Sequence, residues 1–271
     1  MKSNKNKIQN SIWDNRPAEY ESLRQGWLYN RRKKYIEKLL LQRLAESQEL
    51  TELTELTELT ESIESKSKSD FAVLEIGCGT GMLLRDLSKK ISYYDHNNYI
   101  SWTGVEPQSS YVEYALKQNN KNEHRIEYIC SDFESLTLNS TKNQKFDLIL
   151  TNDVLHHLGT DTGTGTGIDF DHYLRVASSL SKKGCMWVAI EPNPFNPYVF
   201  FKQATTYGEK NFRVRNFLNC IRNQSDWKLN KIEFIFIVPP FIKNPHPLLI
   251  KMENMLEGNR VLSGGIVVSL S

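Results

Sequence analysis

The sequence predicts an α/β protein in which helices cover a mostly parallel sheet. Two observations support this prediction. From Phe71 onward, short apolar runs alternate with stretches of helical periodicity, which is the pattern of successive strand and helix units. Seven such apolar runs occur, enough for one large sheet. The 271 residues can form a sizeable core, so we expect a single α/β domain with additions.

The leader, residues 1–46, is expected to form an N-terminal helical cap. Its apolar residues recur at roughly helical spacing and include Trp13, Tyr20, Leu23, Trp27, Tyr35, Leu39, Leu40 and Leu44. Residues 47–69 are of low complexity, and "LTELTELTELTE" repeats every three residues. A period of three drifts around a helix, so these leucines cannot form one core-facing stripe. We expect an exposed helical extension or a linker, and "SIESKSKSD" favours the linker.

Residues 70–271 are expected to form the main domain. The expected strands are 71–76, 99–105, 125–130, 145–151, 185–191, 229–238 and 264–270. Helices are expected at 81–90, 109–120 and 169–184, the last closed by Gly184 as a C-cap. The tract "TGTGTG", residues 162–167, is predicted to be mobile because it is rich in glycine.

Composition excludes several classes of protein. Lys plus Arg (34) nearly balances Asp plus Glu (32), so we predict binding neither to nucleic acid nor to anionic lipid. The four cysteines are far apart and have no zinc-ligand spacing, so no metal site is expected. We expect these cysteines to be reduced thiols of a cytoplasmic protein. The first residues lack the apolar core of a secretory signal, and no apolar run is long enough for membrane insertion.

The stretch "VLEIGCGTG" places three glycines where the first strand ends and a helix begins. Gly77, Gly79 and Gly81 have no Cβ, so the turn can adopt positive φ and a ligand can contact the backbone there. A dinucleotide fingerprint would be spaced G-x-G-x-x-G, whereas this spacing is G-x-G-x-G. Together with Glu75 inside the strand, the difference favours a ligand that carries an amino-acid group in place of phosphates.

The next two strands also end in polar groups. Glu106 can accept hydrogen bonds from both hydroxyls of a ribose. Asp132 suits an amino group, and Phe133 suits the face of a purine. Each residue alone is better explained as a turn residue or helix cap. Their joint placement at one sheet edge indicates a nucleoside site.

With these motifs the chain resembles the class I S-adenosylmethionine-dependent methyltransferases. The resemblance covers about residues 70–271 and rests, in order, on "VLEIGCGTG", "GVEP", "SDFESL", "FDLILTNDVLHHL" and "LSKKGCMWVAIEPN". It implies a Rossmann-like seven-stranded, mostly parallel sheet with an antiparallel last hairpin. It also implies S-adenosyl-L-methionine as cofactor.

The resemblance distributes the parts of that cofactor over the motifs. Glu75 and the loop of Gly77, Cys78, Gly79 and Gly81 would hold the methionine part, Glu106 with Pro107 the ribose, and Asp132 with Phe133 the adenine. Asn152 would offer its carbonyl to the ammonium, beside Asp153. In the leader, Tyr20 and Arg24 would face the carboxylate from a lid over the cofactor, whereas the tryptophans are expected to be packing residues.

The catalytic residues are less defined than the cofactor residues. Methyl transfer from a sulfonium needs alignment and exclusion of water, and no metal. If the acceptor is a hydroxyl, a base would help to remove its proton. His156 and His157 are the candidates for this base, and Asp153 is a weaker candidate. A carboxylate acceptor would need no base. Either histidine could instead pack or cap the turn. Glu191 follows the fifth strand and could contact a polar acceptor, although the neighbouring prolines could simply form a rigid turn.

The expected function is methylation of a small molecule, most plausibly O-methylation of a hydroxyl or carboxylate of a secondary metabolite, sugar or peptide-like substrate. Residues 195–225 would form a substrate wall, in which Arg213 and Arg215 could bind an anion or simply be solvated. C- or N-methylation of quinone or amine type, and binding without turnover, stay as alternatives. No Asn-Pro-Pro-aromatic sequence follows the fourth strand, which argues against a nucleic-acid methyltransferase. The sequence leaves the oligomeric state open.

Overall fold

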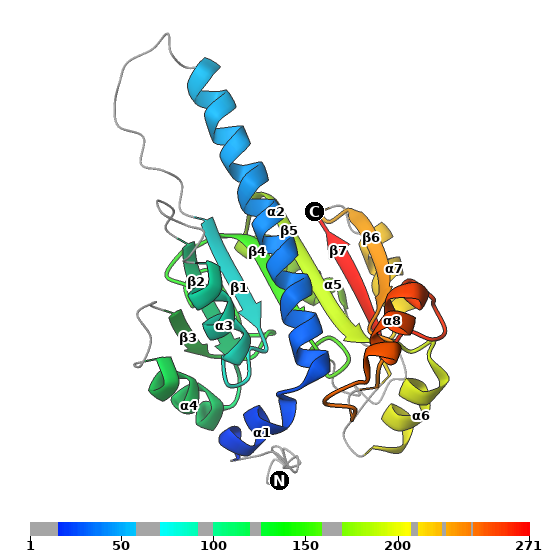
Figure 1. Ribbon diagram of the computed structural model, residues 1–271. Helices are drawn as coiled ribbons and strands as arrows, with labels where there is room; N and C mark the ends of the chain where they lie inside the picture. The colour runs from blue at the N-terminus through cyan, green and yellow to red at the C-terminus, as the bar shows by residue number, and fades with distance from the viewer. Residues whose placement is uncertain are drawn as a thin grey trace, which may run out of the picture.

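The fold is a sheet with helices on both faces, and the long helix of the leader lies across one of these faces (Figure 1). The computed structural model describes residues 16–57 (side chains to 47), 71–91, 100–119, 126–158, 170–206, 211–223, 226–239 and 241–271. Trp13, the "SIESKSKSD" segment, the stretch 92–98 and the "TGTGTG" tract lie outside the described residues.

The seven strands predicted from the sequence are confirmed. They are β1 (Phe71–Ile76), β2 (Ile100–Glu106), β3 (Ile126–Cys130), β4 (Phe146–Asn152), β5 (Ser181–Pro192), β6 (Leu229–Ile235) and β7 (Gly265–Leu270). Their order in the sheet is β3-β2-β1-β4-β5-β7-β6. The first five strands are parallel, and β7 runs antiparallel between β5 and β6. All residues of β1 are buried, as expected for a central strand of a parallel sheet covered on both faces.

The helices complete two covering layers. They are α1 (Pro17–Arg24), α2 (Trp27–Thr57), α3 (Met82–Ile91), α4 (Ser109–Asn119), α5 (Phe170–Leu180), α6 (Pro197–Thr205), α7 (Val214–Asn223) and α8 (Pro247–Leu256). One hydrophobic cluster joins α2 and α3 to the sheet, and the other joins α5 and α7 to it. In α3, the residues Leu83, Leu84, Leu87 and Ile91 form the buried stripe of an amphipathic helix.

The leader is more closely integrated than a separate cap. Ile36 and Leu40 of α2 are fully buried in the cluster that contains β1 and α3. Helix α2 continues through the first "LTE" repeats and ends at Thr57, so this first part of the low-complexity segment is helical. Because α2 covers part of the sheet, removing residues 1–46 would expose core residues as well as remove the lid.

Some element boundaries differ from the sequence prediction. Helix α5 ends at Leu180, and Gly184 (φ +79°) lies in an irregular stretch of β5, so its expected role as a helix C-cap is wrong. Strand β6 stops at Ile235 because Phe236 adopts positive φ (+65°), which a continuing strand cannot accommodate. Helix α8 lies between β6 and β7, so these antiparallel neighbours are not joined by a tight turn.

The parallel strands end at the sheet edge where α1 lies (Figure 1). This placement brings the glycine loop after β1, the turn after β4 and the leader together. Among the helices that the structure describes, none is long and apolar enough to cross a membrane.

Candidate functional site

The glycine loop after β1 has the backbone conformation that its sequence predicts. Gly77, Gly79 and Gly81 have φ values of +74°, +54° and +72°, all in the left-handed region that favours glycine. A Cβ on Gly77 would overlap Val154 Cγ2, and a Cβ on Gly81 would lie 2.5 Å from Tyr128 Cε1. A Cβ on Gly79 would meet nothing closer than 3.5 Å, at Tyr20 Cε1. Two glycines therefore serve packing, and at Gly79 the Tyr20 ring of the leader lies at ordinary contact distance.

Two buried carboxyl groups lie beside this loop. Glu106 accepts hydrogen bonds from the backbone N–H of Gly79 (3.0 Å) and of Gln108 (3.1 Å), so it ties the loop to the end of β2. Glu75 is buried, and its Oε2 has no hydrogen-bond partner among the described residues. Burial, followed by repulsion from Glu106, raises the pKa of Glu75 to about 8. Burial also raises the pKa of Glu106.

The residues at the end of β3 divide between the rim and the core. Asp132 is exposed at the rim, and its Oδ1 accepts a hydrogen bond from Ser135 N (2.6 Å). Phe133 instead lies in the hydrophobic core, with ring centroids 5.1 Å from Tyr173 and 6.0 Å from Trp187. The expected stacking of Phe133 on a purine is therefore not supported, because its faces are packed by other aromatic rings.

Cys78 and Pro107 are two further residues of the expected cofactor set, and they differ in exposure. The Cys78 side chain is buried, and burial raises the pKa of its thiol well above the ordinary value, so the thiol is neutral. Pro107 is exposed at the end of β2. In both, the backbone is the part that can contact a ligand at the loop.

The turn after β4 is clamped to the leader by ion pairs. Asp153, at φ +57°, accepts two hydrogen bonds from the Arg32 guanidinium, one of them at 2.9 Å, and pairs with Arg24 at 3.2 Å. Burial opposes ionisation of Asp153, but Arg32 and Arg24 outweigh it and hold its pKa well below the usual range. The Arg24 guanidinium also lies 4.8 Å from the centre of the Tyr20 ring. These contacts fix α1 over the glycine loop.

Glu191 organises the same turn from below. It is fully buried, and its Oε1 accepts hydrogen bonds from Val154 N (3.0 Å) and Leu155 N (2.7 Å). Its Oε2 lies 2.7 Å from His156 Nδ1. The expected contact of Glu191 with an acceptor is not supported, because Glu191 lies under the turn. It orients His156 instead.

A cavity of about 600 Å³ opens between the lid, the turn after β4 and α6. Its wall includes several of the predicted site residues, namely Tyr20, Arg24, Asn152, Asp153, His156 and His157. Asn152 Oδ1 is buried without a partner among the described residues. The opposite wall comes from α6 and from the segment after β6. Arg213 and Arg215 are exposed and do not line this cavity, which agrees with the solvated alternative.

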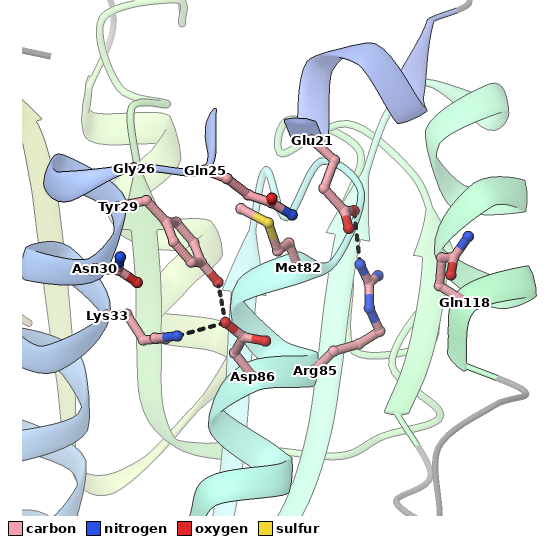
Figure 2. Close-up of a pocket in the computed structure, with 10 residues that line it drawn as sticks. All are labelled: Glu21, Gln25, Gly26, Tyr29, Asn30, Lys33, Met82, Arg85, Asp86 and Gln118. Carbon is pink, nitrogen blue, oxygen red and sulfur yellow. Dashed lines mark hydrogen bonds and ion pairs between the residues drawn. The ribbon is translucent and has the colours of Figure 1, made fainter. Parts of the chain in front are cut away.

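A second, smaller pocket of about 430 Å³ lies where the leader meets α3 (Figure 2). Figure 2 shows Glu21 paired with Arg85 (2.7 Å), and Asp86 bonded to both Tyr29 (2.9 Å) and Lys33 (2.8 Å). Because α3 follows the glycine loop directly, these contacts hold α1 and α2 in a set position relative to the loop.

Comparison with known proteins agrees with this geometry. The family described as "Methyltransferase domain" matches residues 73–165. The chain is 36% identical over 83 residues to malonyl-[acyl-carrier protein] O-methyltransferase of Priestia megaterium, a match that covers 31% of this chain and 26% of that one. It is 33% identical over 86 residues to ubiquinone biosynthesis O-methyltransferase of Coxiella burnetii, covering 32% of each. The matches thus span about a third or less of these relatives.

The fold extends the likeness beyond that region. A crystal structure of an S-adenosylmethionine-dependent methyltransferase from Mesorhizobium loti superposes with a TM-score of 0.51 over 74% of this chain and 91% of that one, at 16% sequence identity. Residues 73–165 thus match a methyltransferase domain, and the fold around them is that of an S-adenosylmethionine-dependent methyltransferase. The resemblance predicted from the motifs is therefore confirmed.

The loop fits the methyl donor of this methyltransferase family. Glu75 Oε2 and Asn152 Oδ1 are buried and have no hydrogen-bond partner among the described residues, which suits a ligand that carries an ammonium group. Gly79 lies beneath the Tyr20 ring, and Tyr20 also lines the cavity. Among the described residues, no group of three His, Cys, Asp or Glu side chains could hold a metal ion.

Sequence reasoning missed two residues of this methyltransferase site. Arg32 is one of many basic residues in the leader, and no local pattern marks its pairing with Asp153, 121 positions away. Gln203 lines the cavity from α6 in a segment predicted only as a substrate wall. Arg32 was undetectable because its partner is distant in sequence, and Gln203 because its burial depends on how α6 packs.

Proposed function

We propose that this chain binds S-adenosyl-L-methionine at the glycine loop and transfers its methyl group to an oxygen of a small molecule. The observation that carries the proposal is the 600 Å³ cavity, which joins the turn after β4 to the lid at the carboxyl edge of the sheet. Both relatives described above are named O-methyltransferases of small or carrier-bound molecules, which favours oxygen as the acceptor atom.

The donor, when bound, supplies a methyl group on a sulfonium that a nucleophile can displace. Glu75, the glycine loop and Asn152 would hold its amino-acid part, and Glu106 its ribose hydroxyls. Each Glu106 oxygen accepts one backbone hydrogen bond and retains a second lone pair. Tyr20 and the Arg24 and Arg32 clamp would close the site and exclude water.

His156 is the proposed base for a hydroxyl acceptor. The Glu191 carboxylate accepts a hydrogen bond from Nδ1, which places the imidazole proton there and leaves Nε2 in the form that can take a proton. His156 lines the cavity, and its neighbour His157 packs against it with ring centroids 3.9 Å apart. A carboxylate acceptor would need no base.

Calorimetry tests the binding step of this proposal. Uptake of S-adenosylmethionine by the wild-type chain is expected, with affinity reduced by about 10- to 100-fold in Glu106→Ala, since one or two charge-assisted hydrogen bonds are lost. Glu113→Ala, an exposed carboxylate on the neighbouring helix α4, is the matched control and should bind as the wild type does. Absence of uptake by folded protein would refute the proposal.

Transfer is tested with radiolabelled donor and a panel of hydroxyl-bearing, carboxylate-bearing and amine-bearing compounds, followed by product analysis. With a hydroxyl acceptor, His156→Asn should lower the rate by about 10²- to 10⁴-fold and leave donor affinity unchanged. With a carboxylate acceptor the same variant should retain most of its activity. Label on nitrogen or carbon would contradict O-methylation.

A further inference from the structure

Helix α6 buries an amide and exposes its aromatic residues. Gln203 is 5% exposed and is the one residue of α6 that is buried, whereas Phe200 and Phe201 are 51% and 68% exposed. A helix that packs for stability alone presents the opposite arrangement, with its apolar side chains inward. The orientation of α6 therefore points to a role for Gln203 other than core packing.

The Gln203 amide has no hydrogen-bond partner within the part of the chain that the structure describes. Both Nε2 and Oε1 are shielded from solvent, and neither bonds to any of the residues that the structure describes. An amide removed from water without compensation costs free energy, and most buried side-chain polar atoms in proteins are paired. Nothing in the packing of α6 compensates for this cost.

Gln203 lies in the wall of the 600 Å³ cavity, in which His156 also lies. The start of α6 is fixed by Asn196, whose Oδ1 accepts hydrogen bonds from Tyr198 N (3.0 Å) and Val199 N (3.2 Å). The same Asn196 donates from Nδ2 to Leu262 O (3.0 Å), which joins α6 to the segment before β7. The helix thus holds Gln203 at a set place beside the cavity.

We propose that Gln203 recognises the methyl acceptor through an uncharged group that offers a hydrogen-bond donor and an acceptor side by side, such as a lactam or a primary carboxamide. The inference rests on the proposed function and names its substrate class. Such a group satisfies both amide atoms of Gln203 after rotation about the terminal side-chain bonds. A carboxylate would leave Oε1 unpaired, and an ammonium would leave Nε2 unpaired.

The surroundings of Gln203 favour a neutral acceptor with apolar flanks. Of the three Lys and Arg residues in the cavity wall, Arg24 and Arg32 are paired with Asp153, and Lys202 is exposed to solvent. Apolar side chains form much of the remaining wall, among them Leu23, Leu28, Val199, Phe236, Ile237, Val238 and Pro239. A largely apolar molecule with one amide-type group matches this wall.

Stability gives a test that needs no acceptor. Gln203→Met removes the unpartnered amide at similar volume, so the midpoint of urea unfolding should rise. The matched control is Gln144→Met, because Gln144 Nε2 donates to Ser101 Oγ at 2.5 Å and its loss should lower the midpoint. A lower midpoint for Gln203→Met would overturn the inference, since the amide would then be stabilising the fold.

Binding gives the second test, with two probes of the same shape. 2-Quinolinone presents an N–H beside its carbonyl, and coumarin has an oxygen in place of that N–H. In the presence of S-adenosylhomocysteine, the wild-type chain should bind 2-quinolinone about tenfold more tightly, the effect of one good hydrogen bond. Gln203→Met should bind both equally. Any of three results would overturn the inference. The wild type could bind both probes equally, it could bind neither, or Gln203→Met could still prefer 2-quinolinone.

Uptake of S-adenosylhomocysteine, measured first, separates this inference from the proposed function. If it binds and the probes are not discriminated, only the assignment of Gln203 fails. If it does not bind, the proposed function fails, and the unfolding experiment decides the role of Gln203.

Discussion

Gly81→Ala is expected to be the most destabilising change in the glycine loop. Gly81 combines a φ of +72° with a close approach of the Tyr128 ring, whose Cε1 would lie 2.5 Å from an added Cβ. Tyr128 projects from the edge strand β3, and its ring must shift to admit the methyl group. The substitution therefore adds a steric clash to backbone strain.

The magnitude can be estimated by separating these two effects. A left-handed conformation costs an L-residue about 1–2 kcal/mol. Displacing a packed ring to admit a methyl group costs about 1–3 kcal/mol more. The expected loss is therefore about 2–5 kcal/mol in the free energy of unfolding.

Gly184→Ala is the matched control, because Gly184 has a similar φ of +79° and an added Cβ there would meet nothing within 4 Å. Only the strain of about 1–2 kcal/mol should appear at this position. Urea unfolding followed by circular dichroism measures both variants. With a slope of about 3 kcal/mol/M, the additional loss at Gly81 corresponds to a midpoint lower by about 0.3–1 M.

A double substitution tests the cause of that additional loss. Tyr128→Ala removes the ring, so in its background Gly81→Ala should cost no more than Gly184→Ala does in the wild type. Equal losses for Gly81→Ala and Gly184→Ala in the wild-type background would refute the reasoning, because the ring would then not restrict the loop. Gly79→Ala should cost only the strain in stability, because an added Cβ there would make ordinary contact with Tyr20 at 3.5 Å.

Three further predictions concern the charged groups of the site. Because the pKa of Glu75 is raised in the folded state, the folded protein binds one more proton than the unfolded chain between about pH 4.5 and 8. The free energy of unfolding should therefore fall as pH rises through this range. Glu75→Gln should remove this pH dependence from urea unfolding. Asp153→Asn keeps a residue that tolerates positive φ but removes the charge that pairs with Arg32. We expect the free energy of unfolding to fall by about 1–3 kcal/mol and tryptic cleavage at Arg24 to become faster. Unchanged cleavage would show that the ion pairs of Asp153 do not hold α1 in place. Glu191→Gln places an NH₂ group where the carboxylate accepts hydrogen bonds from Leu155 N and His156 Nδ1. The free energy of unfolding should therefore fall by about 2–3 kcal/mol, and methyl transfer that depends on His156 should slow. A variant with unchanged stability and activity would show that Glu191 does not orient His156.

The strands and the cofactor motifs were predictable because their signals are local. Strand β1 coincides with the run "FAVLEI", since a strand buried on both faces is apolar almost throughout. The glycine spacing after it required positive φ at three alternate positions, and the structure has it. The placement of Glu106 beside this loop followed from parallel strands that end at the same edge.

Other features depended on contacts between residues distant in sequence. The burial of Phe133 in the core is set by Tyr173 and Trp187, which α5 and β5 bring to it. The bend that ends β6 at Phe236 leaves no signal in "EFIFIV", because strand propensity continues through it.

From its residues alone, this chain specified its sheet, its glycine loop and its family, because periodicity and spacing act within one strand and the turn that follows it. Tertiary structure alone decided that Glu191 orients His156, that Arg32 clamps Asp153, and that α6 turns Gln203 toward the cavity. The physical reason is that a side chain acquires its burial, partners and pKa only when packing brings distant segments into contact.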